Sequence, residues 1–154
     1  LDIAGERIER VEIHRPEGAP VVITKRNAKS LVFSLNGLEG GFKVKYDEEP
    51  KLIATNLEDF ELEDARRAGA VEFTPGKMSR TVFRTFDGLE VTAETTAREG
   101  GFWTRFSFAA SPNSPAAAEA RALGERTKNW VYRIAGYRAE RLTKRFEEMV
   151  APAN

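Results

Sequence analysis

The residue best suited to acid–base chemistry near neutral pH occurs once in this chain, as His14. A histidine in a catalytic triad or a metal site needs partners, and the chain contains neither a second histidine nor a cysteine. Thiolate catalysis, disulfides and the common transition-metal sites are therefore excluded. Alternation of Val11 and Ile13 with Glu12 places His14 on the polar side of a strand, and we expect it to be a solvated strand residue.

Carboxylates are the second candidate for chemistry, because five of them gather in one short stretch, Glu58, Asp59, Glu61, Glu63 and Asp64. On a strand, Glu61 and Glu63 would point the same way about 7 Å apart, a separation that paired-carboxylate hydrolases use. Their alternation with Phe60 and Leu62 predicts instead that the pair faces water, where nearby arginines can neutralise it. We expect a solvated face, so a hydrolase built on this strand is only our third choice of function, after an interaction domain and a small-molecule or lipid-binding module.

A basic stripe on the last predicted helix is the first place where we expect a partner surface. It combines Arg138, Arg141, Lys144 and Arg145, near Arg133. Such a stripe could bind phosphates, lipid headgroups or an acidic protein, although interleaved glutamates can equally form ion pairs along the helix. Trp103 joins this candidate surface because strand parity points it opposite Phe102 and Phe106, which makes it either exposed or buried against a second layer.

The composition of the whole chain is that of an ordinary soluble domain. The chain has 154 residues, of which 41% are hydrophobic and 31% charged, and 24 basic residues balance 24 acidic ones. A neutral chain has no general attraction to nucleic acid, so we expect no nucleic-acid partner. No apolar run approaches the roughly 18 residues of a membrane span. Because the chain begins at Leu1 and not at a methionine, we expect that an upstream segment has been removed.

Hydrophobic periodicity predicts two similar series of elements. Strands are predicted at residues 8–15, around Val21 and Ile23 and at 31–35, followed by a helix at 47–59, a strand at 60–63 and a short further strand at 71–73. The second series has strands at 79–85, 89–96 and 102–108, a helix at 116–128 capped by Ser114 with Pro115 at its first position, and a strand at 130–134. A last helix at 137–150 places Ala139, Leu142, Phe146 and Met149 on one stripe.

The spacing of these elements indicates an internal duplication. The turn that ends at Gly18 recurs as the turn that ends at Gly88, 70 residues later, and Phe60 lies 70 residues before Trp130. We therefore predict an α+β domain of two tandem βββαβ repeats packed around a shared core, with an extra C-terminal helix. The first unit covers residues 1–74 and the second residues 75–154. Each unit alone is too small to bury a sufficient core, so we expect the two to pack together.

Several longer segments carry a family resemblance. In the second half they are TFDGLEVT at 85–92, EGGFWTRFSF at 99–108 and NWVYRIAGYRAERLTKRFEEM at 129–149; in the first half they are IERVEIHRPEGAPVVITKR at 8–26 and FKVKYDEEPKLIATNLEDFELEDARRA at 42–68. With these segments the chain closely resembles an uncharacterised bacterial family catalogued as domain of unknown function 4340. It departs from that pattern at Ala135, where the resemblance leads us to expect a proline.

The resemblance implies a role but no reaction, because its motifs are structural. Members typically carry an N-terminal membrane-spanning helix before the soluble region, and they tend to be encoded beside ABC-type transport components similar to those linked to gliding motility. By this resemblance the chain is the extracytoplasmic, periplasmic part of a non-enzymatic accessory protein, anchored by a helix that precedes Leu1 and contacting proteins of an envelope transport complex. We expect no cofactor and no metal. The alternative is a small-molecule or lipid-binding module with a cleft between the two repeats.

Overall fold

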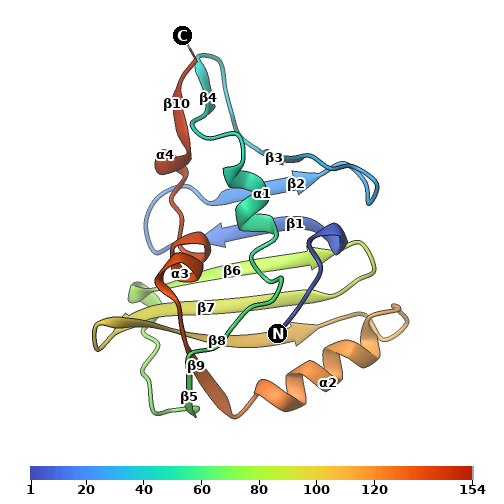
Figure 1. Cartoon of the computed structure of the whole chain (residues 1–154), viewed down its shortest axis with the longest axis vertical. Coiled ribbons are helices and arrows are strands. Elements are labelled where there is room, and N and C mark those ends of the chain that lie inside the picture. The colour runs from blue at the N-terminus through green and yellow to red at the C-terminus, as the bar shows by residue number, and fades with distance from the viewer. Residues whose placement is uncertain (154) are drawn as a thin grey trace.

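The computed structural model describes residues 1–153 and arranges most of them around one eight-stranded antiparallel sheet (Figure 1). The order of its strands is β3 (Phe33–Leu35), β2 (Val21–Lys25), β1 (Ile8–His14), β6 (Met78–Thr85), β7 (Glu90–Arg98), β8 (Gly101–Ala109), β9 (Trp130–Ile134) and β5 (Asp64–Arg67). A separate two-stranded ribbon pairs β4 (Phe42–Val44) with β10 (Val150–Pro152).

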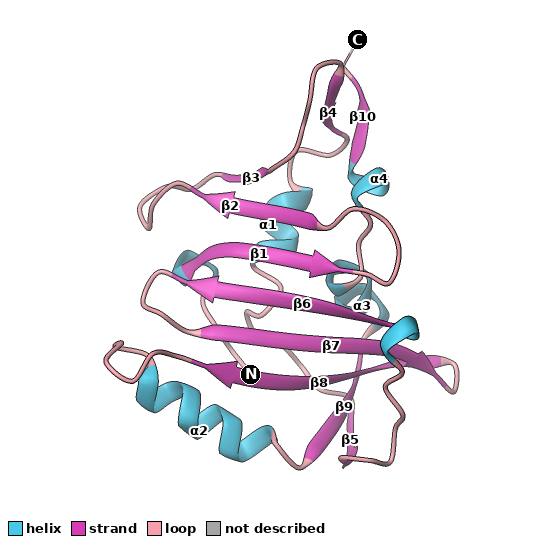
Figure 2. Cartoon of the chain, turned by 180° about the vertical axis from the view of Figure 1, so that it is seen from behind, coloured by secondary structure: helices cyan, strands magenta, loops and turns pink. Residues whose placement is uncertain are grey.

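Short helices connect the strands, and they cover one face of the sheet. They are α1 (Glu49–Ala54), α2 (Ala117–Thr127), α3 (Gly136–Leu142) and α4 (Phe146–Met149), with the single 3-10 turns η1 (Gly5–Arg7) and η2 (Pro75–Lys77). In Figure 1, α1 and α3 lie in front of the strands and α2 runs beside β8; from behind, the strands lie in front of α1 and α3, and the 3-10 turn η2 that leads into β6 lies on the opposite face (Figure 2). The fold is therefore a two-layer α+β arrangement with one covered and one largely bare sheet face. Within residues 1–153, no helix is long and apolar enough to cross a membrane.

The two predicted meanders lie side by side in this sheet and share one ladder. β1 pairs with β6, with Val11 opposite Phe83 and Ile13 opposite Thr81. The halves therefore join edge to edge, and each meander buries its apolar side under helices rather than against the other meander. Two strands of the N-terminal half also leave that half, because β5 pairs with β9 and β4 with β10. The α+β class is confirmed; the tandem repeat and the boundary between residues 74 and 75 remain predictions.

The main core lies between the covered sheet face and the helices. Every second residue of a strand points to the same face, which explains why Val11 and Ile13 of β1 and Val21 and Ile23 of β2 are all buried. The helix side of the core consists of Ile53 of α1, Ala139 and Leu142 of α3 and Met149 of α4. Burial of apolar area of this kind contributes about 25 cal/mol per Å² and is the main source of stability.

Three predicted strands differ from the observed ones. The strand predicted at 60–63 is wrong: Phe60 is buried, but its backbone N–H donates to the carbonyl of Leu1 at 2.8 Å, and the strand β5 begins only at Asp64. The strand predicted at 31–35 shrinks to β3, and Leu31 is 85% exposed. Residues 71–73 form no strand, because they cross the outer face of the sheet without a strand partner there.

The helix predictions are also corrected in length. The helix predicted at 47–59 covers only α1: it ends at Ala54, where Thr55 leaves the helical conformation, and Asp59 further on takes a positive φ of 45° that a right-handed helix does not hold. The last predicted helix is broken into α3 and α4, since the hydroxyl of Thr81 donates to the carbonyl of Leu142 at 2.6 Å and the guanidinium of Arg15 to the carbonyl of Thr143 at 2.5 Å. Thr81 of β6 and Arg15, which follows β1, thus bind the carbonyls of the last residue and of the C-cap of α3 and fix its end.

Two details of the predicted helices have separate outcomes. The predicted cap of α2 is wrong, because Ala116 occupies the cap position and the hydroxyl of Ser114 donates to the carbonyl of Ser111 at 2.9 Å. The apolar stripe predicted for the last helix does face the core, with Met149 fully buried and Phe146 partly buried against it. The side-chain periodicity was therefore sound even though the helix is interrupted.

Candidate functional site

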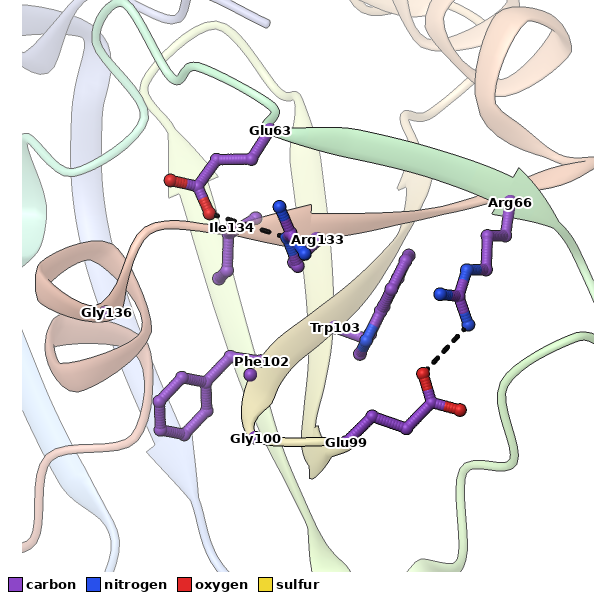
Figure 3. Close-up of a pocket in the computed structure, with 10 residues that line it drawn as sticks. Glu63, Arg66, Glu99, Gly100, Phe102, Trp103, Arg133, Ile134 and Gly136 are labelled. Atoms are coloured by element: carbon purple, nitrogen blue, oxygen red, sulfur yellow. Dashed lines mark hydrogen bonds and ion pairs between the residues drawn. The ribbon is translucent and has the colours of Figure 1, made fainter.

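An open hollow of about 300 Å³ lies at one end of the large sheet, where β5, β8 and β9 meet (Figure 3). Its lining comes from β5 and the residue before it, from the connection between β7 and β8, and from β9 and the start of α3. The residues are Glu63, Arg66, Glu99, Gly100, Gly101, Phe102, Trp103, Arg133, Ile134 and Gly136. The hollow therefore brings together two residues of the predicted partner surface, Arg133 and Trp103, with two that the sequence did not single out for binding, Arg66 and Glu99.

Trp103 forms the floor of this hollow and is only 1% exposed. It packs with Val71, Phe73 and Val131 in a small cluster separate from the main core. Strand parity puts this cluster on the face opposite Phe106, under the chain that runs between β5 and η2 (Figure 2). Of the two alternatives for Trp103, burial against a second layer is therefore the one observed. Trp103 supports the site from below and presents almost no surface of its own to a partner.

Arg66 covers Trp103 from the solvent side. The pairing of β5 with β9 sets Arg66 opposite Val131, so that its side chain lies on the same face as Trp103. The guanidinium carbon of Arg66 is 4.5 Å from the centroid of the indole ring, a cation–π stack. One of its nitrogens, Nη1, donates to Oε2 of Glu99 at 3.1 Å. Arg66 therefore keeps a cation on the surface while its stem and plane shield the aromatic floor.

Glu99 reaches Arg66 because of the tight turn between β7 and β8. Glu99 and Gly100 both have positive φ, 52° and 75°. This left-handed conformation costs a non-glycine residue of order 1 kcal/mol, and it recurs at turns and functional sites. The turn therefore places a carboxylate at the rim of the hollow, at a small cost in backbone energy.

Arg133 supplies the second cation. It lies on β9 opposite both Trp103 of β8 and Asp64 of β5, which fixes its side chain on the same face as Arg66. Its Nε lies 3.7 Å from Oε1 of Glu63, a longer and looser contact than the Arg66 pair. About half of each side chain in this pair is exposed, 48% for Arg133 and 49% for Glu63. Solvent therefore screens the attraction and leaves the guanidinium accessible.

The arrangement is suited to binding anionic groups. Exposed ion pairs contribute about 0–1 kcal/mol, so an incoming carboxylate or phosphate can replace Glu63 or Glu99 at little cost. Each guanidinium offers a planar fork of N–H donors that fits such an anion. The only carboxylates in the lining are Glu63 and Glu99, which form ion pairs with Arg133 and Arg66, and the lining contains no histidine, cysteine, serine, threonine or lysine. Across residues 1–153, no group of three or more potential ligands could hold a metal ion.

Arg138, predicted to bind a partner, instead joins α3 to the chain that follows α1. Its guanidinium donates to the carbonyl of Asn56 at 2.7 Å and to the carbonyl of Asp59 at 2.9 Å. The side-chain amide of Asn56 returns a bond to the carbonyl of Arg138 at 3.2 Å. The plane of Arg138 also lies 5.2 Å from the ring of Phe60. These contacts engage the head group within the fold, which is a structural role.

The rest of the predicted stripe lies outside this hollow: Arg141 and Lys144 line a second hollow, and Lys144 and Arg145 line a third. The ammonium of Lys144 is largely buried between Glu49 at 3.3 Å and Glu140 at 3.2 Å. Burial would lower the pKa of Lys144, but these two carboxylates raise it above its usual value. Arg145 begins α4, where its backbone N–H donates to Glu148 at 3.1 Å, and Arg141 lies over the ring of Tyr137. Only Arg133 of the predicted set presents a half-exposed guanidinium to the hollow.

The candidate acid–base residues stay apart. His14 is exposed on β1, with its Nε2 3.2 Å from Glu12. Hydrogen bonding from Arg10 lowers the pKa of Glu12 from 4.5 to about 2, with help from His14 and Arg84 and against the effect of burial. Glu61 is exposed in an irregular segment and not on a strand, so the predicted pairing of Glu61 with Glu63 is absent. The hollow at β5, β8 and β9 is lined by Glu63 but by neither His14 nor Glu61.

Sequence reasoning missed Arg66 and Glu99 as site residues. Arg66 is one of the arginines near the acidic cluster, and it did not stand out because the strand was predicted at 60–63, four residues before β5. The Glu99-Gly100-Gly101 turn carried a signal, since paired glycines in a hairpin indicate positive φ and a sharply turned rim. Comparisons of the chain with protein-family models, with curated proteins and with solved structures returned no match.

Proposed function

We propose that this chain is a non-enzymatic interaction domain whose arginine-lined hollow binds an acidic segment of a protein partner. One observation carries this proposal: two accessible guanidinium groups, Arg66 and Arg133, share one open hollow over a buried tryptophan, and exposed ion pairs hold both of them loosely. A partner carboxylate that enters the hollow gains two charged donors in place of two weak internal pairs.

The form of the surface supports an interaction domain over the alternative ligand-binding module. That module needs an enclosed apolar cavity at the junction of the two halves. The junction is instead a continuous ladder between β1 and β6, with directly opposed residues from Arg10 to His14. The hollow at β5, β8 and β9 opens to solvent, and four of its ten lining residues are charged, Glu63, Arg66, Glu99 and Arg133.

An enzymatic role has less support, because the shifted carboxylates are shifted in the wrong direction. A general acid or base at neutral pH needs a pKa raised toward 7. The pKa of Glu12 is lowered to about 2, and that of Asp87 is also lowered, since hydrogen bonds from Thr85 and Arg7 outweigh the effect of burial. Both groups are held as carboxylates by arginines in ion pairs on the protein surface.

The family resemblance supplies the biological setting of the proposal. If the chain belongs with the proteins that it resembles, the domain lies on the extracytoplasmic side of a membrane, tethered by an upstream helix, and its acidic partner is a component of an ABC-type transport complex. This setting rests on the resemblance alone.

The test is co-purification of the full-length, anchored protein from its native membrane. The site variant carries Arg66→Gln and Arg133→Gln; the matched control carries Arg121→Gln and Lys128→Gln on the exposed side of α2. Both variants lose two positive charges. We expect transporter subunits to co-purify with the wild type and the control and to be lost from the site variant. Equal recovery with all three proteins, or loss with the control alone, would reject the proposal.

A further inference from the structure

We propose that the end of the molecule beyond β3 docks on an anionic lipid surface. Two projections make up this end. The hairpin tip is the connection between β2 and β3, residues 26–32, and the ribbon tip is the end of the β4–β10 ribbon with the chain that enters and leaves β4, residues 38–46. Figures 1 and 2 both place the two projections at the β3 end of the sheet, away from α2 and β5. The inference does not depend on the hollow or on the function proposed for it.

Exposed apolar side chains are concentrated at these tips. Of the eight large hydrophobic residues that are exposed among residues 1–153, five fall within residues 31–46: Leu31, Val32, Leu38, Phe42 and Tyr46. Leu31 is 85% exposed and Val32 65%, which is unusual for aliphatic residues next to a sheet. Single exposed hydrophobic residues are normal on a soluble protein, but a concentration of them at one end marks a contact surface.

Cations without partners accompany these apolar residues. Arg26 and Lys29 lie on the hairpin tip, and Lys43 and Lys45 lie on the ribbon tip; all four are exposed. Within residues 1–153, none of the four takes part in an ion pair, although most arginines on the sheet do. Glu39 is the single acidic residue between positions 26 and 46, in a chain whose charges otherwise balance. This end is therefore locally basic and attracts an anionic surface.

Each tip combines the two features that a bilayer interface requires. On the ribbon, alternation along β4 puts Lys43 on one side and Phe42 and Val44 on the other, and Val44 packs against the main core. The ammonium of Lys45 lies 5.7 Å from the ring centroid of Tyr46, so cation and aromatic ring occupy the same place on the surface. Aromatic and aliphatic side chains can enter the acyl boundary while lysines remain at the phosphate level.

The shape of this end favours a lipid surface over a protein groove-binder. Residues 26–46 line neither the hollow at β5, β8 and β9 nor the other surface hollows around Arg15, Leu123 and Lys144, and most of them are exposed. Two separate projections can touch one plane at the same time, and a bilayer presents phosphates and apolar chains at every point of that plane. The acidic Asp47 and Glu48 follow only where the chain turns into α1, back toward the covered sheet face.

The test is sedimentation of the 154-residue chain with vesicles of two compositions, pure phosphatidylcholine and a mixture rich in phosphatidylglycerol. We expect binding to the anionic vesicles at low salt, little binding to the neutral ones, and release at high salt. Replacing both lysines in a Lys43→Gln, Lys45→Gln variant should weaken binding about 30-fold, because each juxtamembrane cation contributes about fivefold. A Leu31→Ser, Val32→Ser variant should weaken binding on the same vesicles and reduce what remains at high salt.

Two control proteins separate this proposal from the preceding one. The Arg121→Gln, Lys128→Gln variant loses two positive charges at the α2 end of the molecule, and the Arg66→Gln, Arg133→Gln variant loses two at the hollow. Both variants should bind vesicles as well as the wild type does. Failure of the wild type to bind anionic vesicles at low salt would overturn the proposal. Equal losses in the tip variants and these controls would also overturn it, because general charge would then explain the binding. Binding of an acidic protein through the tips, with no vesicle binding, would assign this end to a protein partner instead.

Discussion

Replacing Arg138 with alanine should destabilise the protein without any partner being present. The wild-type side chain donates to the carbonyls of Asn56 and Asp59 at 2.7 and 2.9 Å, and Asn56 is only 1% exposed. Net contributions of hydrogen bonds to charged groups are about 1.5–3 kcal/mol each, reduced here by partial solvent exposure. We therefore expect Arg138→Ala to lower the free energy of unfolding by about 2–4 kcal/mol, which lowers Tm by roughly 5–12 °C.

Urea denaturation followed by circular dichroism measures this change. The control is Arg141→Ala on the same helix, where the guanidinium only stacks on Tyr137 and the loss should be about 0.5 kcal/mol or less. Arg138→Lys should fall between the two, because an ammonium lacks the fork that donates to two carbonyls at once. If Arg138→Ala and Arg141→Ala had the same unfolding free energy, the structural role argued for Arg138 would be refuted, and its place in a partner surface would be restored.

Three further changes test other parts of the structure. Because the folded pKa of Glu12 is about 2 against an ordinary 4.5, this carboxylate stabilises the fold above pH 4.5, and that contribution is lost as the pH falls through 2. In urea titrations at a series of pH values, Glu12→Gln should therefore lose less stability between pH 4.5 and 2 than the wild type. A variant with the same pH profile as the wild type would contradict the low pKa of Glu12. Trp103→Ala should cost about 3–5 kcal/mol by leaving a cavity under Arg66, whereas a loss below about 1 kcal/mol would mean that Trp103 is not a buried floor. Gly88→Ala should lower Tm in calorimetry, because φ is +97° there and the added Cβ would lie 2.9 Å from a carbon of Ser114; an unchanged Tm would show that this turn relaxes freely.

Much of the sheet could be predicted from the sequence because the spacing of apolar residues in each strand indicates which of its side chains are buried. In β2, in β1 from Val11 onward and in the first part of β7, every second residue is buried, and this pattern follows directly from one covered and one bare face. The same alternation predicted that Tyr132 and Ile134 of β9 face the core, and both are buried there. These features depend only on residues close together in the sequence, so they can be predicted from one sequence alone.

The features that sequence reasoning missed depend on pairing between distant segments. β5 reads Asp-Ala-Arg-Arg and has no apolar alternation, so only its partner β9 makes it a strand. The same applies to β10, which the periodicity merged into a helix and which exists because Phe42 to Val44 pair with it. The site also depends on such pairing, because Arg66 contacts Trp103 and lies near Arg133 only when β5 is paired with β9. Arg138 was likewise predicted to be a surface residue, because its hydrogen-bond partner Asn56 is 82 residues away in the sequence.

The pairings of β4 with β10 and of β5 with β9 also affect how the chain folds as the ribosome makes it. When the first 74 residues have emerged, β1 and β2 can already form a hairpin, but β4 and β5 must wait for partners in residues 130–152. Such contacts between distant segments slow folding and leave the early product with unsatisfied strand edges. Cutting the chain at the proposed repeat boundary should therefore give an N-terminal fragment that aggregates, and mixing the two fragments should restore native structure more effectively than either fragment alone.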